Sequence, residues 1–386
     1  MIQASLKDDG LFGYVRWPLL EFLATALGLA LVSTAAQEPA PSASTAAPIW
    51  DHSLEVHVGL GYTDNVLLAA AARQSTPFTI AGLDAALFRA ALDGPEVSLF
   101  ISGEDRRFLG DVGVGKDETW IAFGRIQRHP RAGWGAGLSL QYLYQDQVFD
   151  VSATETNLLS VQLKGHGLKG TPSLTKDLWE NYELRLEWPV ARQFLAEPLD
   201  DYWENAPRLT FERTYGHRST AALSYTFAQR LYDSRPQTDR AGAAILGTDL
   251  RLQRHEFELA DRHYWDVARH WRSETKLGLE LNSDNGSGYW DFLRYRVSHQ
   301  LRYTGPQWNL QASARLNYYR YDVQPADPPS SDHREVVSIS MTLRGEKDLT
   351  KSAKGFLEIS DEQNNSNRTA NEYRALTVSG GLNWEF

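Results

Sequence analysis

Apolar and polar side chains alternate along most of the chain from residue 51 onward. An alternation with a period of two is typical of β-strands whose two faces meet different surroundings, and it does not fit an amphipathic helix. Segment 337–344, VSISMTLR, shows it without interruption: its apolar side chains are Val337, Ile339, Met341 and Leu343, and its polar ones are Ser338, Ser340, Thr342 and Arg344. The chain is therefore predicted to be all-β.

The alternating segments are long and numerous. We predict sixteen strands, which are 52–64, 78–91, 96–104, 118–126, 134–144, 157–165, 179–189, 207–215, 219–230, 251–260, 272–281, 292–303, 308–321, 335–344, 353–360 and 373–386. Most exceed the ~5–6 residues usual in globular sheets, and they match the roughly 9–11 residues that a tilted strand needs to cross a bilayer. Strand length therefore favours a transmembrane, up-and-down antiparallel β-barrel over a soluble sandwich.

The connections between these strands fall into two classes by length, as the two rims of such a barrel require. Links after even-numbered strands are short, as at 92–95, 216–218 and 304–307. Links after odd-numbered strands are longer and rich in Asp, Pro and Ser, as at 190–206, 231–250 and 322–334. The links at 166–178 and 261–271 are too long for the short class, so a count of fourteen strands stays open.

The first 50 residues have the composition of a targeting segment and a linker. Lys7 and Arg16 precede an apolar run from Phe22 to Val32, and the next four residues, STAA, are small enough for a signal peptidase. Residues 37–50, rich in Pro, Ala and Ser, cannot bury a core. We predict a signal peptide at 1–36, a flexible linker at 37–50 and the barrel at 51–386, with a membrane anchor as the alternative interpretation of the apolar run.

The final segment, YRALTVSGGLNWEF at 373–386, alternates in the same way and carries Trp384 and Phe386 on its apolar face. It resembles the C-terminal signature of bacterial outer-membrane β-barrels. GYTDNV at 61–66 and NNSNRTANEY at 364–373 are similar to segments of porin-like barrels of unassigned transport role. The likeness covers the final segment directly and the rest of 51–386 only as a pattern.

This resemblance implies a location in the outer membrane of a Gram-negative bacterium. It implies outer-membrane lipid and small hydrophilic solutes as partners, and it implies that the barrel-assembly machinery recognises Trp384 and Phe386. It leaves a homotrimer open. The aromatic side chains near predicted strand ends, Trp188, Trp308, Tyr318 and Trp384, are expected to be interface anchors, and a sugar-stacking role for Tyr319 stays open.

A sixteen-stranded barrel is wide enough to leave an aqueous lumen. The predicted function is therefore a pore for passive diffusion or uptake of small hydrophilic solutes. The main alternative is export of a surface polysaccharide, although a linker of this length leaves no room for the periplasmic helical repeats of such exporters. An outer-membrane hydrolase or a structural barrel is the second alternative.

Charged residues on the polar faces of the predicted strands are candidates for the lumen wall. The basic candidates are Arg294, Arg296, Arg302 and Arg315, and the acidic candidates are Glu183, Glu187, Glu212, Glu256, Glu258 and Glu280. If one wall is basic and another acidic, the resulting field would orient charged solutes. Mutual neutralisation of these charges is an equal alternative.

Other classes of function find little support in the residues. The net charge of −10 disfavours nucleic-acid binding, and the chain has no cysteine for a disulfide or thiolate site. HEFEL at His255 lacks the second histidine of a zinc helix, and GDVGVGK at 110–116 lacks the spacing and hydroxyl of a phosphate loop. We predict no enzyme activity, metal site or cofactor. His255, His263 and His270 are spaced across a predicted connection, and we do not expect them to bind a metal.

Overall fold

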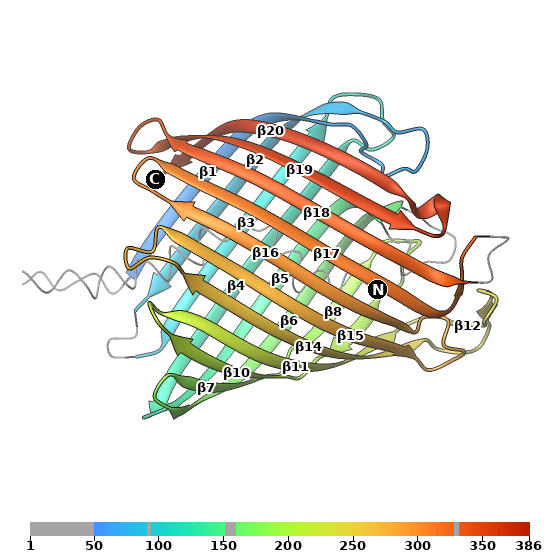
Figure 1. The fold of residues 1–386 in the computed structure, drawn as a ribbon, viewed down its shortest axis with the longest axis horizontal. Helices are drawn as coiled ribbons and strands as arrows, with labels where there is room; N and C mark the ends of the chain where they lie inside the picture. Colours follow the sequence, from blue (N-terminus) through green and yellow to red (C-terminus); the bar gives the residue numbers. More distant parts are fainter. Residues whose placement is uncertain (1–49, 91–93, 151–159, 328–331) are drawn as a thin grey trace, which may run out of the picture.

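One antiparallel sheet, closed on itself, makes up most of the computed structural model, which describes residues 50–90, 94–150, 160–327 and 332–386 (Figure 1). β1 pairs with β2 on one side and with the last strand, β20, on the other. Since consecutive strands pair all the way round, the sheet has no free edge. The predicted up-and-down barrel is confirmed.

The strands of the barrel follow one another in chain order. They are β1 (Trp50–Thr63), β2 (Thr76–Arg89), β3 (Glu96–Phe108), β4 (Lys116–Arg131), β5 (Trp134–Asp150), β6 (Ser160–Trp179), β7 (Tyr182–Glu187), β8 (Val190–Leu195), β9 (Tyr202–Asn205), β10 (Arg208–Tyr215), β11 (Ser219–Tyr232), β14 (Arg251–Tyr264), β15 (Trp271–Asp284), β16 (Phe292–Thr304), β17 (Trp308–Pro325), β18 (His333–Asp348), β19 (Ala353–Ser366) and β20 (Tyr373–Glu385). A small hairpin of β12 (Gln237–Thr238) and β13 (Ala244–Ile245) and a short 3₁₀ helix, η1 (Thr369–Asn371), lie in loops at the long-loop rim.

Two spanning strands are each interrupted by a proline. Pro189 separates β7 from β8, and Pro207 separates β9 from β10. β6 pairs with both β7 and β8, and β11 pairs with both β9 and β10, so each pair of segments crosses the barrel as one strand. A proline has no N–H to give to the ladder, which is why the regular pairing lapses there. Counted in this way, the described residues contain the sixteen predicted spanning strands.

Three predicted connections are wrong. Residues 166–178 belong to β6, which continues to Trp179 and pairs with β5 over its whole length. Most of 190–206 forms β8 and β9, and β14 extends to Tyr264, which shortens the link predicted at 261–271. Glycine, proline and lysine interrupt the strand pattern in these sequences. Pairing with neighbouring strands outweighs the low strand propensity of these residues. The reason for considering fourteen strands disappears with these corrections.

The outer surface of the barrel is apolar. Leu60, Leu140, Leu223 and Leu343 are more than half exposed, as expected for side chains that meet lipid. Exposed aromatic residues gather at strand ends near both rims: Trp50, Trp134, Trp179, Trp265, Trp271 and Trp308 lie next to the short turns, and Tyr62, Phe194, Trp203 and Tyr295 lie towards the long loops. These two girdles mark the interfaces of a membrane.

Of the predicted anchors, Trp308 lies at the short-turn rim, but Trp188 lies between β7 and β8. The prediction placed Trp188 near a strand end; because β7 and β8 cross the barrel as one strand, it lies in mid-strand instead. No helix in the described part of the chain is long and apolar enough to cross a membrane. The predicted signal peptide and all of the predicted linker except Trp50 lie outside the described residues.

Candidate functional site

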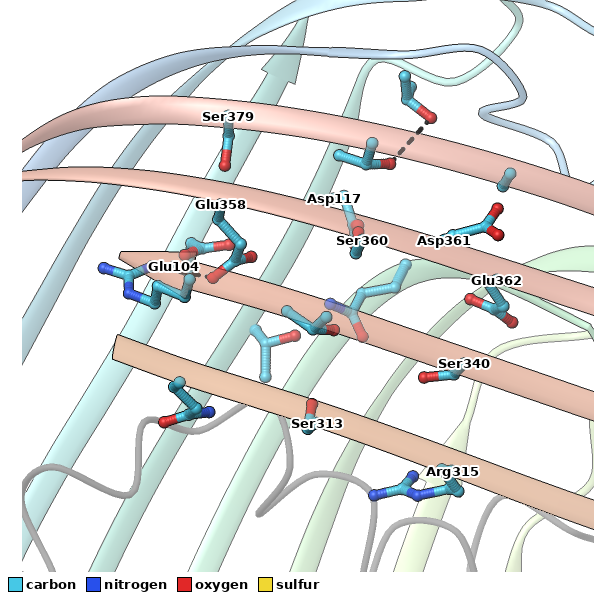
Figure 2. Close-up of a pocket in the computed structure, with 18 of the residues that line it drawn as sticks. Glu104, Asp117, Ser313, Arg315, Ser340, Glu358, Ser360, Asp361, Glu362 and Ser379 are labelled. Atoms are coloured by element: carbon cyan, nitrogen blue, oxygen red, sulfur yellow. Dashed lines mark hydrogen bonds and ion pairs between the residues drawn. The ribbon is translucent and has the colours of Figure 1, made fainter. Parts of the chain in front are cut away.

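A cavity of about 510 Å³, lined by many charged and hydroxyl side chains, lies inside the barrel. Its lining comes from β15–β20 and β1–β5, and none of the described lining residues belongs to β6–β11 or β14, so the cavity lies towards one side of the lumen. Figure 2 shows side chains from β3, β4 and β17–β20 that point into this space. They include Glu104 and Asp117 on one wall and Ser313, Ser340 and Ser360 on the other.

Short hydroxyl side chains line the wall made by β17–β19. Ser313, Ser338, Ser340, Thr342 and Ser360 all line the cavity. Their neighbours of opposite parity are apolar and exposed on the outside of the barrel, as Met341, Leu343 and Leu357 show. The space therefore exists because the inward side chains of this wall are small.

The opposite wall carries a chain of charged and polar groups. Arg106 donates from Nε to Glu104 Oε1 at 2.8 Å, and the other Glu104 oxygen lies 3.3 Å from His57 Nε2. His57 on β1 reaches Glu104 on β3 by passing over Gly82 of β2, where a Cβ atom would lie 2.0 Å from the imidazole Cε1. Glycine at this position therefore permits a contact between strands that are not neighbours.

Towards the short-turn end of the cavity, Arg344 joins two carboxylates. Its Nε donates to Glu346 at 2.8 Å and its Nη1 donates to Glu358 at 2.9 Å. The guanidinium also lies 4.5 Å above the ring of Phe356, which covers that aromatic face. Hydrogen bonding and stacking fix the orientation of this arginine.

On the side of β9–β16, charged side chains pair with one another inside the barrel. Arg294 on β16 is 1% exposed; it forms an ion pair with Glu280 and donates to the Tyr319 hydroxyl at 3.3 Å. Arg230 donates from Nε to Glu204 at 3.0 Å, and both side chains are buried. Long charged side chains here are buried against one another, whereas short hydroxyl side chains line the cavity.

A second group of paired charges involves Arg296. Its Nη2 donates to Glu256 at 2.6 Å and to Glu258 at 2.7 Å, and Arg208 donates to the second oxygen of Glu258 at 3.0 Å. Arg296 lies on β16 and both glutamates on β14, so the guanidinium crosses β15 beside Gly278. This is the same use of glycine as at Gly82.

The ten predicted lumen residues fall into three groups. Five of them, Arg294, Arg296, Glu256, Glu258 and Glu280, meet in ion pairs on β14–β16, where mutual neutralisation describes them better than separate charged walls. Arg302 and Arg315 line the cavity, whereas Glu183, Glu187 and Glu212 lie on β7 and β10 away from its lining. Glu183 accepts a bond of 2.6 Å from Arg185. Their part in permeation stays a proposal.

Residues outside this prediction turn out to face the cavity. His57, Glu104 and Arg106 were detectable in principle, because each falls on the polar parity of its strand. Tyr319 is only 3% exposed and packs edge-on against Phe292, so its ring has no free face for a sugar.

The three histidines considered for metal binding have separate surroundings. His255 lies 2.8 Å from the Tyr225 hydroxyl, His263 lies 3.2 Å from the Tyr215 hydroxyl, and His270 lies 2.9 Å from Asp266 in the β14–β15 turn. In the ranges that the structure describes, no group of three His, Cys, Asp or Glu side chains is placed to hold a metal ion. The glycine-rich segment 110–116 forms the β3–β4 loop and the first residue of β4.

A closed sixteen-stranded barrel with an apolar outer band, two aromatic girdles and a polar interior defines a class of protein. The chain is a transmembrane β-barrel of the outer-membrane type.

Comparison with solved structures returns other outer-membrane barrels. OccAB1 of Acinetobacter baumannii aligns with a TM-score of 0.48 and 8% identity over 87% of this chain and 97% of its own. The anion-selective porin of Comamonas acidovorans aligns at 0.44 and 10% over 87% and 99%, and a bacterial polysaccharide outer membrane secretin at 0.43 and 9% over 86% and 98%. Each likeness lies in the path of the chain. No protein-family model and no curated protein sequence matches the chain.

Proposed function

We propose that the protein is a non-enzymatic pore through which small hydrophilic solutes diffuse across the outer membrane. The observation that carries the proposal is the polar cavity, which lies within a closed barrel and is lined on one wall by short hydroxyl side chains. Water and solutes can replace one another along such a wall, whereas the charged side chains on the other side of the lumen hydrogen-bond one another. The proposed solute path therefore follows the cavity, along β15–β20 and β1–β5.

The absence of native cysteine allows a direct test of this path. Ser340→Cys places one thiol in the cavity, Met341→Cys places one on the outer surface, and Ala228→Cys places one at a buried position on β11 beside the paired charges. Each variant is reconstituted in a planar bilayer, and a water-soluble methanethiosulfonate reagent is added during recording. Modification at residue 340 is expected to lower the conductance of single channels in discrete steps, while the other two channels stay unchanged.

One result would count against the pore, and another against the path proposed for it. A barrel that is folded by gel mobility but never conducts would favour a polysaccharide exporter, a hydrolase or a structural barrel. A conducting channel that responds equally at residues 340 and 228 would show that the path is not confined to one half.

We further propose that Trp384 and Phe386 act as an assembly signal for the barrel-assembly machinery. Trp384 lies on the outward parity of the closing strand, and Phe386, which follows the strand's last residue, is 76% exposed. Removing Phe386 is expected to reduce the folded barrel in cells while leaving refolding of purified protein in detergent unchanged. Equal losses in both would indicate a stability effect instead. We also propose that the barrel forms a homotrimer, which chemical cross-linking in membranes would test.

A further inference from the structure

The hydroxyl side chains of the cavity form a row that runs across five neighbouring strands. Thr63 on β1 is the register partner of Thr377 on β20, which pairs with Ser360 on β19, followed by Thr342 on β18 and Ser313 on β17. All five line the cavity, and Thr377 donates to Thr63 across 3.2 Å. With neighbouring strands about 4.8 Å apart, this hydroxyl row spans roughly 19 Å.

Charged groups flank the hydroxyl row and leave its centre neutral. On the side of the short turns, the next inward positions include Glu358 and Arg344, which pair with each other. On the side of the long loops they include Glu362 and Arg315. A solute lying on the row therefore meets groups that both donate and accept hydrogen bonds, without having to displace a counter-ion.

The charge of the cavity as a whole disfavours anions. Among the described residues, its lining holds eight acidic side chains and five basic ones. The acidic members are Asp84, Glu104, Asp117, Glu274, Glu346, Glu358, Asp361 and Glu362, and the basic ones are Arg106, Lys276, Arg302, Arg315 and Arg344. A cavity with low-dielectric walls and this excess of acidic groups repels a carboxylate more than a neutral molecule of equal size.

Two aromatic rings next to the hydroxyl row are covered by other side chains. Phe356 lies beneath the Arg344 guanidinium, and Tyr319 is buried against Phe292. At the row itself, a solute therefore meets hydroxyl groups and not the face of either ring.

We propose that the hydroxyl row of Thr63, Thr377, Ser360, Thr342 and Ser313 is a binding surface for small uncharged polyhydroxylated solutes, and that it selects them over anions of the same size. This inference rests on the proposed pore function. A solute with several hydroxyl groups can make hydrogen bonds to successive strands at once, and it can exchange them one by one as it moves.

The test compares sorbitol with gluconate, which has the same six carbons but a carboxylate in place of one terminal alcohol group. Uptake of each, labelled and at trace concentration, is measured in proteoliposomes. At concentrations far below saturation, flux through a pore rises with affinity for a site inside it. Sorbitol is expected to enter faster than gluconate.

A triple variant removes three hydroxyl groups with little change in volume: Ser313→Ala, Thr342→Val and Ser360→Ala. We expect its sorbitol flux to fall about five-fold, as for the loss of one or two neutral hydrogen bonds, while its KCl conductance stays at the parental level. The matched control carries Ser173→Ala, Thr210→Val and Thr226→Val, at positions of inward parity on β6, β10 and β11 that do not line the cavity. The control should transport sorbitol like the parent.

The outcomes separate this inference from the pore itself. If the parent conducts KCl but takes up gluconate as fast as sorbitol, or if the triple variant keeps its sorbitol flux, the inference is wrong and the pore stands. If the folded parent conducts nothing, the pore proposal fails and the inference fails with it.

Discussion

Two regions of the lumen wall differ in their inward side chains. On β9, β11, β14 and the parts of β15 and β16 nearest the long loops, charged inward side chains pair with one another, as Arg294 does with Glu280; this region is the paired half. On β17–β20 most inward side chains are uncharged, and hydroxyl groups such as those of Ser313, Ser340 and Ser360 line the cavity; this region is the open half, to which Arg302 on β16 also contributes. The contrast suggests a division of labour in which one half carries stability and the other carries passage.

The largest expected effect concerns stability in the paired half. Arg294→Met leaves Glu280, which is 2% exposed, without its ion pair, and breaking a buried pair costs about 3–5 kcal/mol. Ser340→Ala in the open half should change the free energy of unfolding by less than about 0.5 kcal/mol. Urea unfolding in lipid vesicles, followed by tryptophan fluorescence and gel mobility, measures both.

A double variant distinguishes the loss of the ion pair from a loss of packing around residue 294. Because Glu280→Gln also removes the stranded charge, Glu280→Gln with Arg294→Met should recover part of the lost free energy. Equal stabilities for Arg294→Met and Ser340→Ala would end the proposed division of labour.

A smaller effect is expected on ion selectivity, and here substitutions in the open half should have the larger effect. Arg302 and Arg315 line the cavity, so Arg302→Gln with Arg315→Gln should shift the zero-current potential in a KCl gradient towards potassium selectivity. Arg294→Gln with Arg296→Gln removes the same formal charge from the paired half, and should leave the potential unchanged. Single-channel recording reports only on folded molecules, so loss of yield does not confuse the comparison. A larger shift from the second pair would reverse the assignment of the conducting half.

The two halves also differ in how far the sequence predicts them. Strict alternation on β17 and β18 assigns Ser313 and Ser340 to the polar face from local sequence alone. The ion pairs do not follow from any one strand, because Arg296 and Glu256 are 40 residues apart and on strands that are not neighbours. Their meeting depends on register across β15 and on the missing side chain of Gly278, which only the assembled barrel reveals.

The error in the predicted connection at 166–178 has a related cause. Gly170 and Pro172 interrupt the outward apolar face of β6 and Gly167 lies on its inward face, so the sequence is typical of a turn, although pairing with β5 keeps it extended. Closure of a barrel recruits such segments because an unpaired backbone in a membrane is costly. Local pattern therefore predicts strand faces well and strand ends poorly.

The smallest expected effect concerns the turns beneath the two halves. In the β14–β15 turn of the paired half, Asp266 accepts hydrogen bonds from the backbone N–H groups of Trp271 at 3.0 Å and His270 at 3.1 Å. These bonds, with the Trp271 N–H first, hold the pKa of Asp266 below its usual value. In the β16–β17 turn of the open half, the Gly305 N–H donates to the Trp308 carbonyl at 2.8 Å.

Only the first turn should then depend on the charge of a carboxylate. Because the pKa of Asp266 is lower in the folded state, its contribution is complete above the unfolded pKa of about 3.9 and is lost as the pH falls through the folded value. At pH 6, Asp266→Ala should speed hydrogen exchange at the amides of His270 and Trp271, whereas the Gly305 amide should be unaffected. Unchanged exchange at His270 and Trp271 would mean that the backbone alone fixes this turn, and that the paired half owes its order to the lumen side chains.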